Sequence, residues 1–138
     1  MSSNWHEVVA DWQSGLTFIG KNDLDRSLQM GSKKEEGNIS PMELLLLGLA
    51  GCTGYDIVSI LQKKRLDLKK FQVKVRGKRV DTYPMVYSEI EVEYLLWGEG
   101  VTEKAVRQAI ELSEHKYCSA TAMLEETADI TSTFQIFD

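Results

Sequence analysis

The sequence lacks several features that mark large classes of protein. Basic side chains are outnumbered by acidic ones, 16 to 21, and no basic stripe is interleaved with aromatic residues. We therefore expect neither nucleic acid nor an anionic membrane surface as a partner. Residues 1–7 hold no basic segment followed by an apolar one, so no secretory signal is predicted and a cytoplasmic location is expected. Only two cysteines are present, Cys52 and Cys118, with no CxxC pair, which excludes a disulfide scaffold.

What the chain does contain is enough apolar material for one folded domain. Hydrophobic residues make up 43% of the 138 positions, which is ordinary for a globular protein with a core. The length is close to the common size of a single domain. We therefore predict one domain over residues 1–138.

The first 39 residues read as short strands. Residues 5–12 and 16–19 are β-rich runs separated by Ser14 and Gly15, which predicts a hairpin, and residues 24–30 form a third candidate strand. The polar segment 31–38 begins with one glycine and holds another near its end. It is predicted to be a mobile surface loop.

Residues 40–63 carry the strongest helix signal. Ser40, Pro41 and Glu43 form a capping box with proline at the first helical position. The apolar run 44–61 has the length of a membrane span. Asp56 inside the run, and amphipathic strands elsewhere that need a covering helix, favour a central helix buried in a soluble protein instead.

The rest of the chain predicts a hairpin over residues 69–98, helices over 102–126 and a closing strand over 129–138. Strict alternation of apolar and polar residues in the strands indicates one wet face and one core face, which is typical of antiparallel sheets. The helices are expected over residues 102–114 and 118–126. The fold class is therefore α+β, with a mainly antiparallel sheet, a long buried central helix and a second helix that bears Cys118.

Cys52 lies on the one partly polar stripe of the central helix. At 100° per residue the stripe holds four side chains. They are Cys52, Asp56, Ser59 and Lys63. Three glycines, Gly48, Gly51 and Gly54, require close approach of another backbone or of a ligand, because glycine destabilises a helix by about 1 kcal/mol. We therefore predict that Gly48 and Asp56 line a pocket beside Cys52. The alternative is an inert, buried thiol.

Cys118 is predicted to lie at a helix N-terminus, where the helix dipole and the unpaired N–H groups favour a thiolate. Lys116 adds positive charge nearby. The spacing of His115 and Cys118 resembles a metal-ligand pair, but zinc needs three or four ligands and no second cluster is evident in the sequence. No metal site is predicted.

Two segments resemble a known family. Residues 40–52 (SPMELLLLGLAGC) are similar to the first-cysteine motif of the OsmC/Ohr superfamily, the osmotically induced and organic hydroperoxide resistance proteins. Residues 116–124 (KYCSATAML) are similar to its second-cysteine motif. The residues of both motifs are most similar to those of the YhfA-like branch. The resemblance extends from Trp12 to the C-terminus.

The resemblance implies an intertwined homodimer that acts as a thiol-dependent peroxidase without a cofactor. Cys52 would be the peroxidatic thiolate and Cys118 the resolving thiol. The substrate would be an organic hydroperoxide or another small apolar molecule. A dithiol, carried by a lipoylated protein in characterised members, would reduce the resulting disulfide.

The sequence departs from the family pattern at the groups that support the thiolate. Family members carry a glutamate ten residues before the first cysteine, where this chain has Met42, and an arginine from the N-terminal region. Glu43 and Arg26 are the available substitutes. Serine replaces a common proline after Cys118.

Two other functions stay open. The glycine-rich helix and the Cys52 stripe are also consistent with a non-enzymatic binding module that has an apolar pocket at a dimer interface. A dithiol redox sensor is the third interpretation. The peroxidase hypothesis requires the two sulfurs to meet in the folded protein, since a disulfide needs Cα atoms within about 7 Å.

Overall fold

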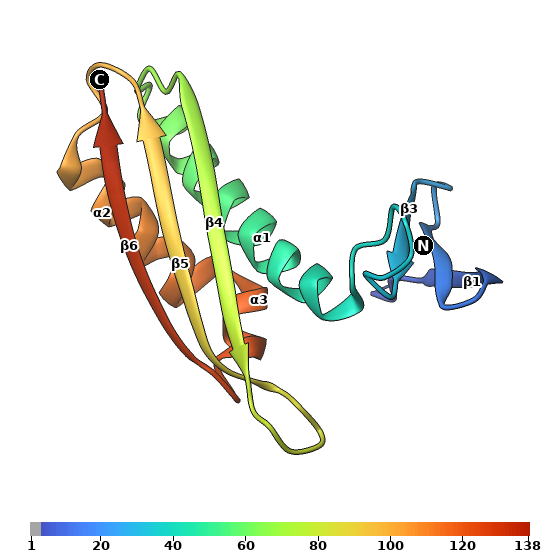
Figure 1. Ribbon diagram of the computed structural model, residues 1–138. Coiled ribbons are helices and arrows are strands. Elements are labelled where there is room, and N and C mark those ends of the chain that lie inside the picture. Colours follow the sequence, from blue (N-terminus) through green and yellow to red (C-terminus); the bar gives the residue numbers. More distant parts are fainter. Residues whose placement is uncertain (1–3) are drawn as a thin grey trace. The chain divides into compact units, whose positions relative to one another are not determined.

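The computed structural model describes residues 4–138. Their contacts form two compact units, one ending at Leu45 and the other beginning at Leu46. The prediction of one domain over the whole chain stays a prediction. The elements along the chain (Figure 1) are β1 (Val8–Ser14), β2 (Thr17–Asn22), β3 (Ser27–Gly31), α1 (Pro41–Lys63), β4 (Lys70–Arg79), β5 (Tyr87–Trp97), α2 (Glu103–Leu112), η1 (Ser113–Tyr117), α3 (Ser119–Leu124) and β6 (Asp129–Phe137).

The N-terminal unit is a three-stranded antiparallel sheet in the order β1, β2, β3. The predicted strands are confirmed with their ends shifted by a few residues. The predicted break lies in the turn between β1 and β2, where Gly15 has a φ of +51° that favours glycine. The indole N–H of Trp12 donates to the Gly15 carbonyl at 2.9 Å and stabilises the same turn.

The polar segment after β3 forms hydrogen bonds with Leu16 and Thr17, at the start of β2. The Glu35 carboxylate accepts a hydrogen bond from the Leu16 backbone N–H at 2.8 Å. The Asn38 side chain donates to the Thr17 hydroxyl and to the Ser32 carbonyl, each at 2.9 Å. The segment is thus an organised loop, and its predicted mobility stays a prediction.

Helix α1 begins with the predicted capping box. The Glu43 backbone N–H donates to the Ser40 hydroxyl at 3.2 Å, and the Glu43 carboxylate accepts from the Ser40 backbone N–H at 3.0 Å. Lys33 forms an ion pair with Glu43 at 3.2 Å. These contacts satisfy N–H groups that the first turn of a helix leaves without partners.

The C-terminal unit holds a second three-stranded sheet in the order β4, β5, β6. Strands β4 and β5 are antiparallel, as predicted, but β6 pairs with β5 in parallel. The sequence predicted a mainly antiparallel sheet without giving the direction of the closing strand, and the structure adds that β6 is parallel to β5. The reason is that α2, η1 and α3 form a helical crossover, which returns the chain to the end of the sheet where β5 began.

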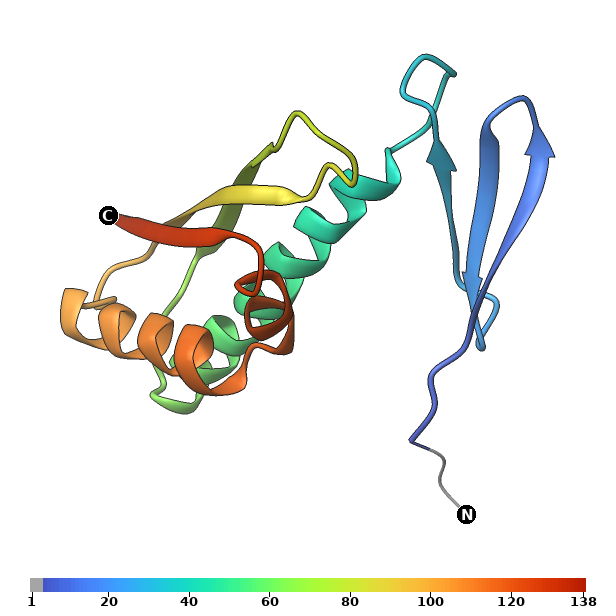
Figure 2. The same cartoon turned by 90° about the horizontal axis from the view of Figure 1, so that it is seen from below.

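The helices of this unit lie on one face of the sheet (Figures 1 and 2). Alternate residues of β5 face them, and the intervening glutamates face away, as the alternation predicted. Helix α2 begins at the N-cap Thr102, whose hydroxyl accepts from the Ala105 N–H at 3.2 Å. The fully buried apolar side chains of the core come from α1, β5 and α2. They are Leu49, Ile57, Leu61, Ile90, Tyr94, Leu96, Val106 and Ala109.

Helix α1 is long and apolar enough to cross a membrane by length and composition, yet one side of it packs in this core. The sequence predicted burial on all sides. In the single chain the buried residues follow one stripe, whereas Leu47 is 54% exposed and Tyr55 is 78% exposed. Packing within the C-terminal unit therefore accounts for one face of α1.

Candidate functional site

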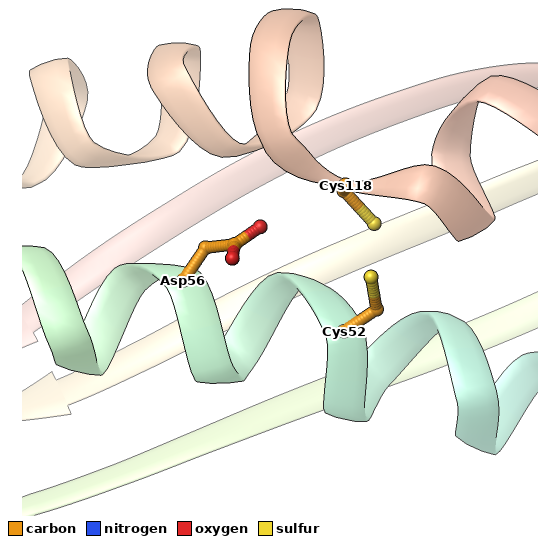
Figure 3. Close-up of side chains that lie close together, drawn as sticks. All are labelled: Cys52, Asp56 and Cys118. Atoms are coloured by element: carbon orange, nitrogen blue, oxygen red, sulfur yellow. The ribbon is translucent and has the colours of Figure 1, made fainter. Parts of the chain in front are cut away.

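The first half of the site lies on the polar stripe of α1. Cys52 and Asp56, one helical turn apart, are both half-buried and project from the same side of the helix (Figure 3). Their neighbour Thr53 is buried and donates its hydroxyl to the Leu49 carbonyl at 3.0 Å, one turn back. One face of α1, with Leu49 and Thr53, is therefore buried in the core, and the face beside it carries the Cys52 thiol and the Asp56 carboxylate.

The second half is built by the break between α2 and α3. Residues 113–117 form a single π-helical turn, in which the Cys118 backbone N–H donates to the Ser113 carbonyl at 2.7 Å. Cys118 then caps α3, and its sulfur accepts from the Thr121 N–H at 3.3 Å. The predicted position of Cys118 at a helix N-terminus is confirmed. π-Helical turns of this kind occur often at functional sites because they redirect one side chain.

The two halves meet at the sulfur atoms. Figure 3 shows the Cys52 and Cys118 side chains pointing toward each other from facing segments, with the Asp56 carboxylate beside them. The two sulfurs and a carboxylate oxygen of Asp56 all lie within 4.8 Å of one another. Both thiols are free. Residues 66 positions apart in the sequence are therefore brought together, as the peroxidase hypothesis requires.

The prediction that Cys118 favours the thiolate is wrong in its net direction. Burial raises the pKa of the Cys118 thiol above its ordinary value, and the neighbouring Cys52 raises it further. The backbone N–H and the side chain of Thr121 oppose this shift but do not outweigh it. Lys116 lies over the Tyr117 ring, with Nζ 5.3 Å from the ring centre, and is not among the groups that shift the Cys118 pKa.

Asp56, beside the cysteines, and Glu114, on the turn before Cys118, are both hydrogen-bonded carboxylates, and sequence reasoning missed Glu114. The Ser113 hydroxyl donates to the Asp56 carboxylate at 2.9 Å. Glu114 accepts from the Tyr94 hydroxyl at 2.8 Å and from the Ser132 hydroxyl at 3.1 Å. Burial and the Glu114 charge raise the pKa of Tyr94 strongly, so its phenol stays a donor. Sequence reasoning missed Glu114 because a charged residue at the end of an expected helix is usually exposed, although Glu114 lies four residues after the buried Ile110 and so on the same helix face.

Glu43 and Arg26, the substitutes for the family's glutamate and arginine, have local roles in the N-terminal unit. The capping interaction with Ser40 and the Lys33 ammonium lower the pKa of the exposed Glu43 carboxyl. Glu43 lies nine residues before Cys52, which is about two and a half turns of an α-helix and directs the two side chains about 180° apart. Arg26 is exposed, and its backbone closes the turn before β3 with Asn22. Catalytic roles for both stay predictions.

The glycines of α1 separate into two kinds. A side chain at Gly54 would meet Phe71 and Val73 of β4 at 3.4 Å, so this glycine lets the helix approach the sheet closely. At Gly48 and Gly51 a Cβ would meet no atom of the described residues 4–138 within 4 Å, apart from the helix's own backbone. Among the described residues, the expected close approach is therefore explained at Gly54.

An apolar hollow follows the exposed side of α1 and the edge of β4. Its volume is about 580 Å³. Neither Gly48 nor Asp56 is among its lining residues, so their predicted pocket-lining role stays a prediction. The lining is formed by Leu47, Ala50, Gly51, Gly54, Tyr55, Val58, Ser59, Gln62, Phe71 and Val73.

With this geometry established, comparison with known proteins gives the family. Residues 32–133 match the family described as OsmC-like protein. The chain belongs to the OsmC-like family. Protein YhfA of Escherichia coli K12 is 34% identical over 125 residues, which cover 91% of this chain and 93% of YhfA.

Solved structures agree with the OsmC-like assignment. A crystal structure of a protein from Aquifex aeolicus is 34% identical, with a TM-score of 0.89, and the match covers 99% of both chains. An organic hydroperoxide resistance protein OsmC from Legionella pneumophila is 11% identical, with a TM-score of 0.72 over 98% of this chain and 99% of that one. At that identity the second likeness shows the fold alone. The predicted family and α+β fold are thus confirmed.

Proposed function

We propose that this OsmC-like protein is a thiol-dependent hydroperoxide reductase, with Cys52 as the peroxidatic residue and Cys118 as the resolving one. The observation that carries the proposal is the approach of the two sulfurs to within 4.8 Å. Exposure assigns the roles. Cys52 is half-buried and can meet a substrate, whereas Cys118 is 4% exposed and can meet only what lies beside it.

The reaction balances with one hydroperoxide and one external dithiol. The Cys52 thiolate attacks the distal oxygen of R–O–O–H, the O–O bond breaks, and R–OH leaves once the alkoxide takes a proton. The sulfenic acid on Cys52 then reacts with the Cys118 thiol, which forms the S–S bond and releases water. A dithiol reductant restores both thiols by exchange and is itself oxidised to a disulfide.

The organic character of the substrate is supported by the surroundings of α1. Apolar residues line the hollow on the exposed side of the helix, and one wall of it includes Gly51, the neighbour of Cys52. The Legionella relative is named for resistance to organic hydroperoxides. We therefore favour an alkyl or aryl hydroperoxide over hydrogen peroxide as the substrate class.

A second copy of the chain is the proposed cover for the exposed side of α1. Leu47 and Tyr55 are exposed there, and Gly51 has open space around it in the single chain. An apolar face of this kind is typical of an interface between subunits. We therefore propose a homodimer, located in the cytoplasm. Leu47→Glu should shift the protein toward monomer in sedimentation velocity, while Met123→Glu, at an apolar position on α3 that is even more exposed, should not.

The peroxidase proposal is tested by mass spectrometry of the reduced protein after treatment with cumene hydroperoxide below one equivalent. The expected product is an intramolecular disulfide between Cys52 and Cys118, found in the linked pair of peptides. Cys118→Ser should instead accumulate a sulfenic acid on Cys52 that dimedone traps. Two unmodified thiols after treatment would overturn the proposal.

The apolar hollow also supports a binding module as a second candidate function. If the protein binds without turnover, a hydrophobic small molecule should raise the melting temperature while peroxide leaves both thiols intact. Gly51→Leu, which fills part of the hollow, should then abolish the thermal shift. Turnover of cumene hydroperoxide by the wild-type protein would decide against this alternative.

A further inference from the structure

We propose that the reduced protein binds a zinc ion between Cys52, Asp56 and Cys118. The three side chains come from two segments, the middle of α1 and the N-cap of α3, and they converge on one point (Figure 3). Their sulfur and oxygen atoms lie within 4.8 Å of one another. This proposal does not depend on peroxidase activity, because it concerns the reduced thiols in the absence of any oxidant.

The donor set matches zinc in type and number. Thiolate sulfur and carboxylate oxygen are both common zinc ligands, and sites that bind a further molecule keep three protein ligands and one open position. Two soft sulfurs disfavour magnesium and calcium, which prefer oxygen. The site therefore selects a borderline or soft divalent ion.

The distances are close to those that a tetrahedral ion needs. With Zn–S bonds of about 2.3 Å, two ligating sulfurs are about 3.8 Å apart. Cys52 and Cys118 lie within 4.8 Å, so binding requires the sulfurs to close by at most about 1 Å. A small change in the χ1 angle of Cys52, whose side chain is half-buried and not packed on all sides, supplies a movement of this size.

Neighbouring groups already hold two of the ligands. The fully buried Ser113 donates its hydroxyl to the Asp56 carboxylate at 2.9 Å, which fixes the orientation of that carboxylate. The Thr121 N–H donates to the Cys118 sulfur at 3.3 Å, an interaction that a thiolate accepts better than a thiol. Such outer contacts orient ligands and raise metal affinity in known sites.

A cation also fits the charge of the site. Asp56 brings a carboxylate beside the two thiols. A divalent ion would supply the positive charge that lets both thiols lose their protons.

The same ion would connect metal binding to oxidation. Two zinc-bound thiolates are donors to the ion, whereas the sulfurs of a Cys52–Cys118 disulfide are not. If one hydroperoxide oxidises the pair, R–OH and water leave as described above, and the ion is released as Zn²⁺ without change of its own oxidation state. Reduction of the disulfide by a dithiol would restore the site.

The test titrates the full chain, reduced and freed of metal, with Co²⁺ and Zn²⁺ in the absence of oxygen. We expect one ion per chain, with the visible and near-ultraviolet bands of a tetrahedral, thiolate-ligated cobalt ion. Zinc should displace the cobalt and abolish these bands. Competition against a chromophoric chelator gives the affinity. Binding of neither ion under these conditions would overturn the proposal.

Variants locate the ion. Cys52→Ser, Cys118→Ser and Asp56→Asn should each weaken binding by on the order of a hundredfold or more, and Ser113→Ala by about ten- to a hundredfold. His115→Ala is the matched control, because His115 is the other candidate ligand near Cys118 and is exposed. Circular dichroism establishes that each variant is folded. Unchanged affinity in both cysteine variants, or loss of binding in His115→Ala, would place the ion elsewhere and overturn the proposal.

The outcome is separable from that of the proposed function. A protein that binds zinc but leaves cumene hydroperoxide unreduced supports the metal site and overturns the peroxidase. A protein that forms the disulfide with peroxide but never binds the ion does the reverse. If both hold, adding the hydroperoxide to the zinc-loaded protein should release one ion per disulfide formed.

Discussion

The surroundings of Cys52 and Cys118 differ, although their two sulfur atoms lie within 4.8 Å of each other. Cys52 lies in the middle of a 23-residue helix, half-buried, beside a glycine with open space around it. Cys118 caps a six-residue helix, is 4% exposed and is held by hydrogen bonds with the backbone groups of Ser113, Thr121 and Ala122. The difference in exposure is the basis on which we propose different roles for the two thiols, with the more exposed Cys52 meeting the substrate and the buried Cys118 resolving the oxidised Cys52.

The largest expected effect comes from exchanging each thiol for a hydroxyl. Cys52→Ser should lower the rate of hydroperoxide reduction by on the order of a thousandfold or more, because a serine hydroxyl is not a nucleophile at neutral pH. Cys118→Ser should retain one fast oxidation of Cys52 but lose steady turnover with a dithiol. Stopped-flow and steady-state assays measure the two phases. Equal behaviour of the two variants would remove the asymmetry between the cysteines.

The hydrogen bond from Tyr94 to Glu114 is expected to have the next largest effect, on stability. Tyr94→Phe removes the buried donor and should lower the free energy of unfolding by about 1–3 kcal/mol, because it leaves a carboxylate oxygen of Glu114 without its partner. Tyr83→Phe, at an 87% exposed position, is the control and should change stability little. Urea denaturation followed by circular dichroism measures both, and an equal effect at the two positions would contradict the role of Tyr94.

A smaller effect is expected in the pH dependence of alkylation. Because burial raises the pKa of the Cys118 thiol above its ordinary value of 9.0, the reactive thiolate should form there only at higher pH than in an unfolded peptide. Iodoacetamide labelling from pH 7 to 10, followed by peptide mass spectrometry, measures Cys118 and Cys52 in the same sample. We expect faster labelling of the more exposed Cys52. A Cys118 that labels readily at neutral pH would contradict this expectation.

The smallest effect is expected at Lys116. Its ammonium group lies over the Tyr117 ring and is not among the groups that shift the Cys118 pKa. Lys116→Met, which keeps the length of the side chain, should therefore leave the pH profile of Cys118 labelling unchanged. A shift to higher pH would show that the lysine supports the thiolate after all, and would make the two cysteines more alike.

Part of the site was accessible from the sequence because it depends on local rules. The capping box of Ser40 and Glu43 predicted where α1 begins. The 3.6-residue period of an α-helix predicted that Cys52 and Asp56 lie on the same face of it. The two cysteine motifs gave the family and, through it, the pairing of Cys52 with Cys118. Signals of this kind depend on a few neighbouring residues, so they can be recognised in the sequence without knowledge of the fold.

Other features escaped sequence reasoning because they depend on how the chain returns on itself. The alternation of apolar and polar side chains in residues 130–136 predicts which face of β6 is buried. It does not predict whether β6 pairs with its neighbouring strand in parallel or antiparallel. Glu114 lies four residues after the buried Ile110, but its partners Tyr94 and Ser132 come from the sheet and are set by how the sheet packs against the helices. Burial likewise reversed the expected direction of the Cys118 pKa shift, since the depth of a thiol is a property of the packed unit.

The sequence alone therefore determined the helix that carries Cys52, the cap that carries Cys118 and the family to which both belong, because capping, periodicity and motif are short-range properties. Only the tertiary structure decided that two sulfurs and the Asp56 carboxylate converge within 4.8 Å and that one thiol is buried while the other is partly exposed. The physical reason is that distance and solvent exposure arise from contacts between segments far apart in the chain, which the crossover from β5 to β6 brings over α1.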